Sequence, residues 1–339
     1  MTATPVLQPA RNRAPQNLKQ RLPWRMQLAL SPSFYVERLT DAVFRRVLST
    51  RPLAAGDGNV EVMSLLDRRN LNNYLLAIKS LLLNSPVPLA VTVLSDGTLR
   101  AEDRLVLQKH VHGIRVLERS DVTLPAAAAS EINRWCDEYP YLAKLMYLPF
   151  ASRKPLLLIM DSDVIFRRSL PANFFSLRDD VAAKFNCDHD HRVYDPKFHY
   201  LEAYAADRGI KLIHNLNCGL MLWRAAHLRP LDSLGFLRQL AETEGHLHAV
   251  SEQDAWSLLA SQSIAEALPD EYLVLSNWAV NDVEHRRRAI TVHYVSGERY
   301  RRLDYLRDGR QMIRLLRQTR SSGNSPATRQ ARELDCQNT

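Results

Sequence analysis

Two carboxylates stand at the end of an apolar run in the middle of the chain. Residues 156–160 are Leu, Leu, Leu, Ile and Met, and Asp161, Ser162 and Asp163 follow them. In an extended chain the side chains at positions i and i+2 point the same way, so both carboxylates would project together from a buried strand. Carboxylates this close repel each other and are stable chiefly with a cation between them. The pair therefore indicates a site for Mg²⁺ or Mn²⁺, which prefer oxygen ligands. The alternative is a solvated strand end that binds no ion.

Strands and helices alternate around this pair. The elements predicted up to residue 160 are a helix over 33–48, a strand over 60–65, a helix over 71–83, a strand over 88–94, a helix over 101–110, a strand over 114–117, a helix over 131–148 with a break at Pro140, and a strand over 154–160. The elements predicted after residue 180 are strands over 181–186, 216–222 and 290–295 and a helix over 252–261. Alternation of this kind implies an α/β fold with a mostly parallel sheet covered on both faces. Such sheets bind ligands beyond the carboxyl ends of their strands, where the two aspartates stand.

Composition limits the class of protein. The chain has 339 residues, of which 46% are hydrophobic and 24% are charged. These values are typical of a globular protein with a sizeable core and exclude a collagen, a coiled-coil rod and a wholly disordered chain. No apolar run reaches the roughly 18 residues of a membrane span. The four cysteines form no CxxC pair, so we expect neither a zinc ribbon nor a disulfide framework, and a cytoplasmic location.

The net charge of +8 is concentrated at the two ends of the chain. Residues 1–36 carry five basic and no acidic side chains, and residues 286–339 carry thirteen basic and five acidic ones. Basic ends favour an anionic neighbour, such as a membrane surface, a nucleic acid or a phosphorylated ligand. A general preference for arginine is the other explanation.

Residues 303–318 have the pattern of a basic amphipathic helix. Its apolar positions are Leu303, Leu306, Met312, Ile313 and Leu316. Such a helix can lie on an anionic membrane surface, held there by the arginines between the apolar positions. The favoured interpretation is that the apolar stripe packs on the core and that Gly309 breaks the helix in the middle.

The sequence around the acidic pair resembles glycosyltransferase family eight, whose members have the GT-A nucleotide-sugar transferase fold. That family has a basic residue upstream of an Asp-x-Asp motif at the end of a strand. In the segment 142–166, Lys144 holds the basic position, and Asp161 and Asp163 hold the motif. Further blocks follow in the family's order, so the resemblance extends over about residues 60–300. These blocks are LLD at 65–67, KS at 79–80, NCGLML at 217–222, EQDA at 252–255 and VHY at 292–294.

The resemblance implies a role for each block. It implies that Asp161, Asp163 and His293 hold a metal ion, Mn²⁺ or Mg²⁺. The catalytic candidates are Gln253, which would face the reacting carbon, and its neighbour Asp254. The donor-binding residues that follow from the resemblance are Leu66, Asp67, Lys144, Ser162, Asn217, Cys218, Gly219, Glu252, Gly297 and Arg299.

Most of these residues also have a purely structural explanation. The histidine within the apolar strand 290–295 would more often be a core residue than a ligand, and the resemblance is what favours the ligand. Lys144 would be a surface lysine whose stem lies along apolar neighbours. Glu252 and Asp254 suit the first turn of a helix because of its dipole. Asn217 suits a turn at the start of a strand.

Two features stand apart from the resemblance. Residues 186–191, NCDHDH, are dense in metal-ligand types. Alternation would put the aspartates and the histidines on opposite sides, so we expect a polar loop on the acceptor side of the cleft rather than a second metal site. The family often places an aromatic residue shortly after its first-strand aspartate to stack on the base. Asn70 and Leu71 occupy those positions, so stacking by that route is lost.

The sequence thus predicts a GT-A-like, Rossmann-like α/β enzyme. We expect residues 1–57 to form a basic N-terminal extension followed by a helix. Residues 58–300 would form a single catalytic domain, and residues 301–339 a basic helix with a disordered tail. The predicted reaction is metal-dependent transfer of a sugar, with retention, from a nucleoside-diphosphate sugar such as a UDP-hexose to a glycan or lipid-linked acceptor. The alternatives are an inverting transferase with Glu252 or Asp254 as base, a metal-dependent phosphohydrolase and a non-catalytic nucleotide-sugar binding module. We expect a cytoplasmic protein with no nucleic-acid partner, for which peripheral contact with an anionic membrane stays open.

Overall fold

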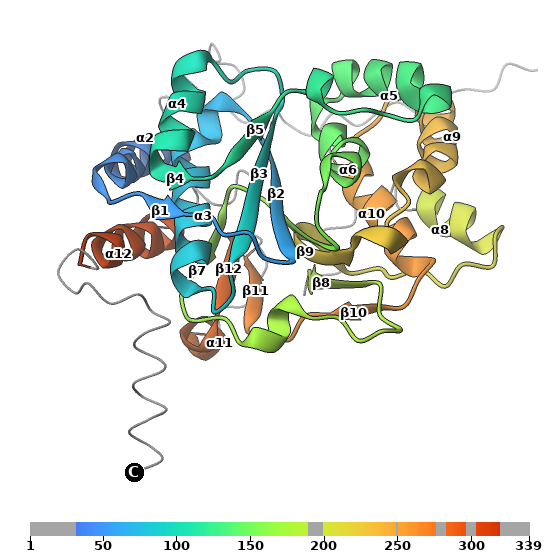
Figure 1. The fold of residues 1–339 in the computed structure, drawn as a ribbon. Coiled ribbons are helices and arrows are strands. Elements are labelled where there is room, and N and C mark those ends of the chain that lie inside the picture. The colour runs from blue at the N-terminus through green and yellow to red at the C-terminus, as the bar shows by residue number, and fades with distance from the viewer. Residues whose placement is uncertain (1–31, 189–198, 249, 276–282, 296–302, 319–339) are drawn as a thin grey trace, which may run out of the picture.

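A seven-stranded sheet forms the centre of the molecule (Figure 1), in the order β10-β8-β9-β6-β2-β3-β5. The computed structural model describes residues 32–188, 199–248, 250–275, 283–295 and 303–318. The strands of the central sheet are β2 (Val60–Leu66), β3 (Leu89–Ser95), β5 (Arg115–Leu117), β6 (Leu156–Met160), β8 (Ala183–Cys187), β9 (Leu216–Arg224) and β10 (Ala265–Ala267). Because β9 alone runs antiparallel to its neighbours in this sheet, the sheet is mostly parallel, as the sequence predicts.

A smaller sheet continues from the end of β6. Its strands are β7 (Val164–Phe166), β11 (Tyr272–Leu275) and β12 (Thr291–Tyr294). β12 lies in the middle, parallel to β11 and antiparallel to β7. Two further short strands, β1 (Leu53–Ala54) and β4 (Val111–His112), pair with each other. Since β7 follows β6 after a turn, the two sheets meet where the acidic pair stands.

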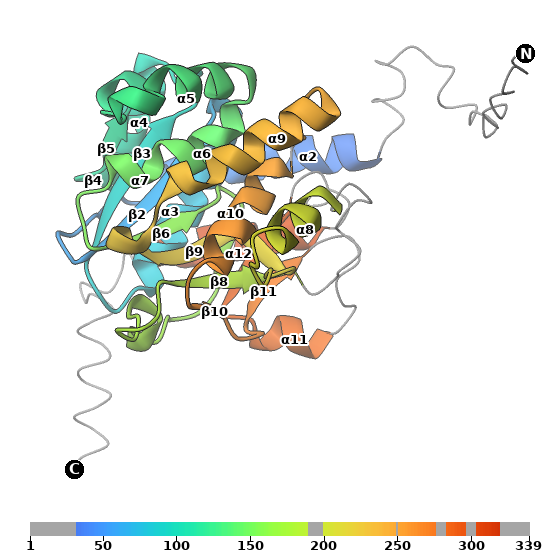
Figure 2. The same ribbon diagram turned by 90° about the vertical axis from the view of Figure 1, so that its right-hand side faces the viewer.

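Helices cover both faces of the central sheet. They are α2 (Pro32–Phe44), α3 (Leu71–Asn84), α4 (Ala101–His110), α5 (Ala126–Glu138), α6 (Ala143–Met146), α7 (Leu148–Ala151), α8 (His199–Ala206), α9 (Leu234–Glu244), α10 (Ser251–Ser261), α11 (Val283–Arg288) and α12 (Asp304–Gln318). Figure 1 shows α2, α3 and α12 on one side and α5, α6 and α10 on the other, and Figure 2 shows α8, α9 and α10 in front of the sheet.

Alternate residues of β6 enter two separate hydrophobic clusters. Leu158 and Met160 pack with the side chains of α2, α3 and α12, whereas Leu157 and Ile159 pack with those of α5, α6, α9 and α10. A strand that is apolar at every position is expected in a sheet that is buried on both faces. The run of five apolar residues before Asp161 is therefore explained by its central place in the sheet.

Most predicted elements are present with nearly the predicted ends. The helix over 101–110 is α4, and the strand over 60–65 is β2, which ends at Leu66. The helix expected over 131–148 is divided. Its first piece, α5, begins already at Ala126, and the chain continues after Tyr139 as a short 3₁₀ helix over Pro140–Leu142 and then as α6. Proline cannot continue a helix in its interior, so the break at this position is as predicted.

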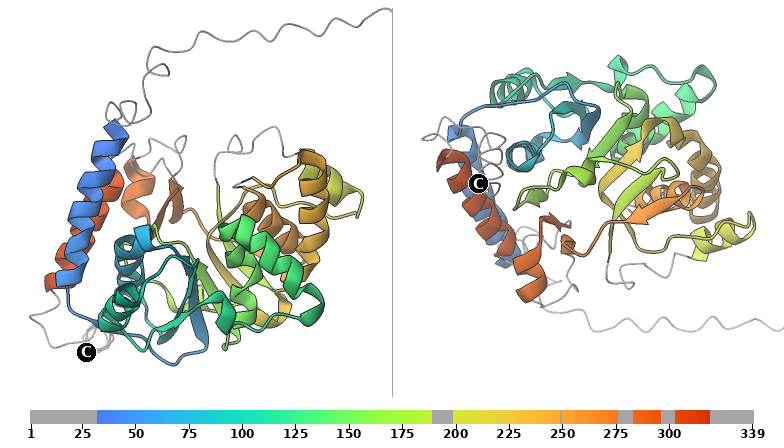
Figure 3. Two further views of the ribbon diagram at one scale, coloured as in Figure 1. Left: turned by 90° about the horizontal axis from the view of Figure 1, so that it is seen from above. Right: turned by 60° about the horizontal axis from the view of Figure 1, so that its bottom comes forward.

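The C-terminal helix α12 packs against α2 and the core (Figure 3). It runs without a break through Gly309, so the predicted break is wrong. A Cβ at Gly309 would overlap the ring of Phe44, and this close approach of the two helices explains the glycine. Tyr305 also stacks edge-on against Phe44, with 4.8 Å between ring centroids.

Most of the apolar stripe lies in the core, as the favoured interpretation predicts, but Leu306 is half-buried and Leu303, which precedes α12, is exposed. Met312, Ile313 and Leu316 are buried in the same cluster as α3, while the arginines of the helix are exposed. The buried stripe leaves that face of the helix unable to insert into a membrane. Among the described residues, none of the helices has both the length and the apolar character needed to cross a bilayer.

A polar contact joins α12 to the smaller sheet. The hydroxyl of Tyr294 on β12 donates a hydrogen bond to the buried carboxylate of Asp308 on α12. The guanidinium Nε of Arg167 lies 3.5 Å from the same carboxylate. The rings of Tyr294 and Tyr305 are 4.7 Å apart. The helix is thus fixed to the strand that carries His293. The domain boundaries at 57/58 and 300/301 stay predictions, and the helices outside them share their core with the helices inside.

Candidate active site

The two aspartates lie in a turn between the two sheets. β6 ends at Met160, β7 begins at Val164, and Asp161 to Asp163 form the turn between them. The backbone N–H of Asp161 donates to the carbonyl oxygen of Gly219 at 2.9 Å. The two carboxylates converge as predicted. The reason is this turn and not the alternation of an extended strand, so that part of the sequence argument is wrong.

Pairing between β7 and β12 brings a histidine to the two carboxylates. His293 stands opposite Val164 in the antiparallel pair, directly beside the turn. Its Nε2 lies 3.2 Å from Oδ1 of Asp163 and 3.8 Å from Oδ2 of Asp161. One ligand atom from each of the three residues lies within 4.8 Å of the others. The structure therefore assembles the three residues that the resemblance named as metal ligands.

The donor set fits a hard divalent cation. Burial alone would lower the pKa of His293, but the neighbouring charges, first Asp163 and then Asp161, raise the pKa above its usual value. The surroundings therefore favour positive charge at this position. Two carboxylates and one imidazole with their donor atoms this close are ligands that Mn²⁺ and Mg²⁺ accept. The site thus fits the ion that the resemblance implies.

Gly219 makes room for the imidazole ring. The glycine lies on β9 next to the turn, and a Cβ built on it would overlap Cε1 and Nδ1 of His293 and lie 2.7 Å from Nε2. Any other residue here would push the ring away from the two aspartates. The resemblance predicts that this glycine contacts the donor. The structure shows that the ring of His293 takes this place.

Lys144 lies below the acidic pair, on the short helix α6. Its ammonium is buried, at 2.9 Å from Oδ1 of Asp161 and 3.2 Å from Oε1 of Glu252. It also lies 3.3 Å from the carbonyl oxygen and 3.4 Å from Sγ of Cys218. Burial by itself would lower the pKa of Lys144, but these groups, Asp161 first, raise it well above its usual value. Lys144 is thus a buried cation and not a surface lysine.

Glu252 is held from two sides at the start of α10. Its Oε1 accepts a hydrogen bond from Nε1 of Trp256 at 2.6 Å in addition to its ion pair with Lys144. Burial raises the pKa of Glu252 and outweighs the opposing effect of Lys144. The thiol of Cys218, whose pKa burial also raises, lies 4.0 Å from Oε2 of Glu252. These contacts hold the first turn of α10 against the candidate metal site.

Asp188 is a site residue that sequence reasoning missed. It follows β8, and its backbone N–H donates to the carbonyl oxygen of Asn215 at 2.8 Å. Its Oδ1 accepts from Nδ2 of Asn217 at 3.1 Å, and its Oδ2 accepts from Nε2 of Gln253 at 3.0 Å. The sequence argument placed Asp188 in a polar loop and gave it no role. Its position directly after a strand that runs parallel to β6 was the available signal, because the carboxyl ends of such strands share one edge.

The two catalytic candidates differ in their surroundings. Gln253 is half-buried and points to Asp188, with its Oε1 3.9 Å from Sγ of Cys218. Asp254 is buried, and its Oδ1 has no hydrogen-bond partner among the residues that the structure describes. Burial raises the pKa of Asp254 to about 7. Gln253 is therefore part of the network around the candidate metal ligands. Asp254 is a carboxyl group that ionises near neutral pH.

The first-strand residues lie at the carboxyl end of β2. The side chain of Leu66 is in the core, so the backbone is the part of this residue that remains for a ligand. The carboxylate of Asp67 accepts from the backbone N–H of Asn70 at 2.9 Å and from its side-chain Nδ2 at 2.6 Å. Asp67 also lines a pocket of about 510 Å³. Its other lining residues are Arg68, Arg69, Asp96, Thr98 and Arg100.

The remaining predicted residues are Ser162, Gly297 and Arg299. Ser162 is the middle residue of the metal-site turn and is half-buried. Gly297 and Arg299 lie outside the described residues, and so do the last three residues of the segment 186–191. Within the part of the chain that the structure describes, the side chains that could hold a metal ion are the three named above.

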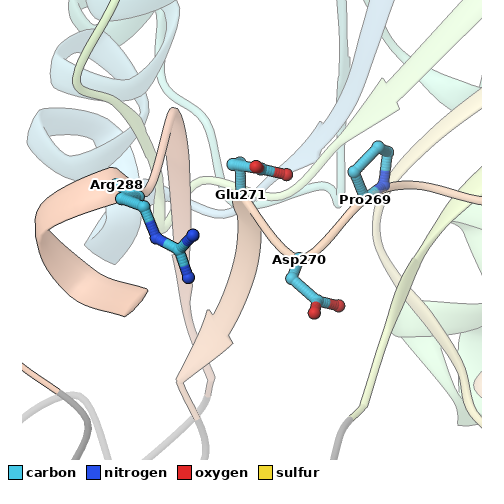
Figure 4. Close-up of a pocket in the computed structure, with 4 residues that line it drawn as sticks. All are labelled: Pro269, Asp270, Glu271 and Arg288. Atoms are coloured by element: carbon cyan, nitrogen blue, oxygen red, sulfur yellow. The ribbon is translucent and has the colours of Figure 1, made fainter. Parts of the chain in front are cut away.

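A second pocket lies away from these residues. It has a volume of about 360 Å³ and lies where α11 meets the start of β11 (Figure 4). Its lining residues are Pro269, Asp270, Glu271 and Arg288. The carbonyl oxygen of Glu271 accepts the backbone N–H of Ile290 at 2.7 Å, which joins the loop to the start of β12. The pocket shares no lining residue with the metal site or with the pocket at Asp67.

Comparison of the sequence with protein-family models gives no match, and comparison with curated proteins gives none either. Solved structures do match. The galactosyltransferase LgtC in complex with donor and acceptor sugar analogs has a TM-score of 0.51 and 15% identity, over 78% of this chain and 97% of that one. An active-site mutant of LgtC has a TM-score of 0.51 and 14% identity, over 76% and 94% of the two chains. The apo form of mouse xyloside xylosyltransferase 1 has a TM-score of 0.43 and 12% identity, over 72% and 98%.

The likeness to LgtC establishes the fold. The chain has the α/β fold of the GT-A glycosyltransferases, with a mostly parallel central sheet, as the sequence predicts. At such low identity a structural likeness does not carry substrate or reaction with it. Membership of glycosyltransferase family eight stays a prediction, and the function has to be argued from the site.

Proposed function

We propose that the protein is a metal-dependent glycosyltransferase that transfers a hexosyl group from a nucleoside-diphosphate sugar to an acceptor. The observation that carries the proposal is the cluster of Asp161, Asp163 and His293 at the carboxyl end of β6 in a fold of the GT-A type. Ligands of such sheets bind at this edge. The solved LgtC complex holds donor and acceptor sugar analogs, which supports the same classes of ligand here.

The metal ion would act on the departing nucleoside diphosphate. Bound to Asp161, Asp163 and His293, Mn²⁺ or Mg²⁺ supplies Lewis-acid stabilisation of the charge that develops on the leaving phosphate. The protein's part is to keep the three ligands together. The turn between β6 and β7 fixes the positions of the two carboxylates, and the pairing of β7 with β12 fixes the position of the imidazole.

Lys144 acts through the carboxylates. Its ammonium is enclosed by Asp161, Glu252 and Cys218, so it neutralises charge that the protein itself concentrates at the site. Without a cation here, Asp161 and Glu252 would repel each other in a buried place. We therefore expect Lys144 to hold the carboxylate of Asp161 in place as a ligand, and its effect on the diphosphate to be electrostatic.

Gln253 and Asp254 are the candidates for work at the sugar. An amide does not titrate, so Gln253 cannot serve as a base and suits a role facing the reacting carbon during transfer with retention. Asp254 is a buried carboxyl group whose pKa lies near 7, which is the range expected of a catalytic acid or base. For the donor we propose a UDP-hexose, with Asp67 and the backbone of Leu66 at the base.

The acceptor would be a glycan or a lipid-linked sugar, and the protein would work in the cytoplasm. Its binding surface would lie beyond Asp188 and Gln253. The remaining donor-binding candidates are Ser162, Asn217, Gly219, Gly297 and Arg299, of which the last two would contact phosphate. Mn²⁺ is the proposed ion, with Mg²⁺ as the substitute.

Titration of UDP-glucose and UDP-galactose into the purified protein, with and without Mn²⁺, tests the proposal. We expect donor binding that requires the ion and that Asp163→Asn abolishes, because Asp163 is the aspartate nearer to His293. Asp180→Asn, which removes an exposed carboxylate elsewhere, is the matched control and should bind as the wild type does. Equal donor affinity of the Asp163→Asn variant and the wild type with Mn²⁺ would overturn the metal site.

Analysis of the product separates the proposed reaction from its alternatives. The NMR spectrum of the glycosylated acceptor should show the anomeric configuration of the donor. An inverted product would indicate direct displacement, with Glu252 or Asp254 as the general base, instead of transfer with retention. Release of phosphate without an acceptor would indicate a phosphohydrolase. Binding of donor and metal without turnover across an acceptor panel would indicate a binding module.

A further inference from the structure

A single buried carboxylate accepts hydrogen bonds from two amides at the edge of the site. Asp188 is 3% exposed, and its two oxygens accept separately from Nδ2 of Asn217 at 3.1 Å and from Nε2 of Gln253 at 3.0 Å. The three residues come from the end of β8, the start of β9 and the first turn of α10. Because β9 runs antiparallel between β8 and β6, its start lies at the edge where both of those strands end.

The chemistry of the carboxylate decides which end of each amide faces it. An ionised carboxylate only accepts hydrogen bonds, so both amides must turn their NH₂ groups to Asp188. The oxygen of Asn217 then faces the opposite way. There it accepts the backbone N–H of Gly219 at 3.0 Å, which agrees with this orientation. The amide of Asn217 is thus held at both ends.

The orientation of Asn217 in turn fixes the tautomer of His293. Oδ1 of Asn217 lies 2.8 Å from Nδ1 of the imidazole. Since that oxygen can only accept, Nδ1 must carry the proton. Nε2 of a neutral imidazole is then the nitrogen with the free electron pair, and it is the one that faces Asp163 and Asp161. An acceptor on the second ring nitrogen is the usual way in which proteins orient a histidine ligand.

We propose that Asp188 is a positioning residue. Through Asn217 it makes Nε2 of His293 the metal-binding nitrogen. It also turns the amide oxygen of Gln253 away from the carboxylate of Asp188. This inference rests on the metal site of the proposed function. Asp188 is joined to His293 by Asn217, and the direct contacts shown for its carboxylate are with the two amides. Its carboxylate also adds to the negative charge around His293, and the neutral Asp188→Asn variant separates that charge from the orientation of the ligand.

Three variants separate positioning from a general structural effect. Asp188→Leu is close in size and removes both acceptors, so Asn217 loses one of its two anchors. We expect its Mn²⁺ affinity, measured by isothermal titration calorimetry, to fall about 10-fold or more, the usual range for a lost partner of a histidine ligand. Asp188→Asn keeps one acceptor oxygen for Asn217 if Gln253 turns, so its affinity should stay within about threefold of the wild type. Gln253→Leu removes the other amide and should also leave Mn²⁺ affinity unchanged.

The tautomer can be read directly and does not need a variant. In the wild-type protein labelled with ¹⁵N-histidine and loaded with Zn²⁺, the ring of His293 should show its proton on Nδ1 and the metal on Nε2. His293→Gln identifies the signal by its disappearance. In Asp188→Leu we expect this signal to broaden or to divide between two forms, because the amide of Asn217 can then turn.

The outcomes are distinct. Coordination through Nδ1 in the wild type, or unchanged Mn²⁺ affinity and an unchanged tautomer in Asp188→Leu, would overturn the inference and leave the metal site intact. An equal loss in Asp188→Asn, Asp188→Leu and Gln253→Leu would also overturn it, since that pattern belongs to a general loss of packing. A wild-type protein that binds neither Mn²⁺ nor Zn²⁺ would overturn the metal site, and the inference with it. If Asp188→Leu does not fold, the wild-type spectrum and the Asp188→Asn affinity still decide.

Discussion

The imidazole ring of His293 lies directly against the backbone of Gly219, with no space between them for a Cβ atom. One residue belongs to the small sheet and the other to the central sheet. Their contact is where the two sheets meet around the metal ligands. The glycine thus sets how closely β12 can approach β9, and with it the distance between His293 and the two aspartates.

Substitution of Gly219 should therefore impair the metal site. In Gly219→Ala the added methyl group would displace the ring of His293, and we expect Mn²⁺ affinity to fall at least 10-fold. Overpacking should also lower the free energy of unfolding by about 1–3 kcal/mol. Isothermal titration calorimetry and urea unfolding measure the two effects. Met221→Leu, a core substitution of similar volume on the same strand, is the control. Wild-type Mn²⁺ affinity in Gly219→Ala would show that the ring has another stable position.

Removing the buried ammonium of Lys144 should destabilise the folded protein when no metal ion is bound. Lys144→Met leaves Asp161 and Glu252 without their partner, and breaking a buried ion pair from one side typically costs about 3–5 kcal/mol. Adding Glu252→Gln to this variant removes one of the stranded charges and should restore part of the loss. Urea unfolding in the presence of a chelator measures both. A Lys144→Met variant as stable as the wild type would mean that the two carboxylates do not need the ammonium.

Asp254 should make stability depend on pH. Burial raises its folded-state pKa from 3.8 to about 7. Between these values the folded protein holds a proton that the unfolded chain has lost, so this group lowers the free energy of unfolding as pH rises through the window. In Asp254→Asn that loss is absent. We expect equal stability near pH 4, and a variant more stable by up to about 4 kcal/mol at pH 8, from about 1.4 kcal/mol per pKa unit.

Thermal unfolding of wild type and Asp254→Asn across this pH range provides the measurement. Asp180→Asn, at an exposed position, should show no such pH-dependent difference. A constant offset between the Asp254→Asn variant and the wild type at every pH would mean that the carboxyl group ionises normally.

The contact between α2 and α12 should make Gly309 intolerant of a side chain. Alanine favours a helix over glycine by about 1 kcal/mol, so an exposed site would gain stability. At Gly309 the new methyl group would meet the ring of Phe44, and we expect Gly309→Ala to lose about 1–3 kcal/mol instead. Phe44→Leu should be less harmful in the Gly309→Ala background than alone. Additive effects in this double-mutant cycle, measured by urea unfolding, would contradict the contact.

Residues close to a strand end could be placed from the sequence. The apolar run before Asp161 identified a central strand, and the order of strands and helices identified a mostly parallel sheet. The position of His293 could not be derived in this way. Its approach to Asp163 depends on the antiparallel pairing of β12 with β7, between segments more than a hundred residues apart in the chain. The resemblance supplied what local patterns could not.

Tertiary contacts explain the remaining differences. The burial of Lys144 depends on a helix of one turn, which carries too few residues to show which face is buried. Gly309 looked like a helix break because the nearness of Phe44 is invisible in the local sequence. Asp188 was grouped with the polar residues after it, although it stands two residues after the end of the predicted strand 181–186. A rule that tests every polar residue after a parallel strand would have found it.

The hydrogen bond from Tyr294 to Asp308 bears on how the protein is made. The ribosome completes Asp161 and Asp163 when about half of the chain exists, and His293 appears much later. The strand that carries His293 is held by α12, which is translated last of the described elements. Domains generally fold as units during synthesis, so we expect the nascent chain to gain its metal site only after α12 has docked on Phe44 and Tyr294. A ribosome that stops before Asp308 would then release a chain with an open core and without the assembled candidate metal site, which we expect cellular proteases to degrade.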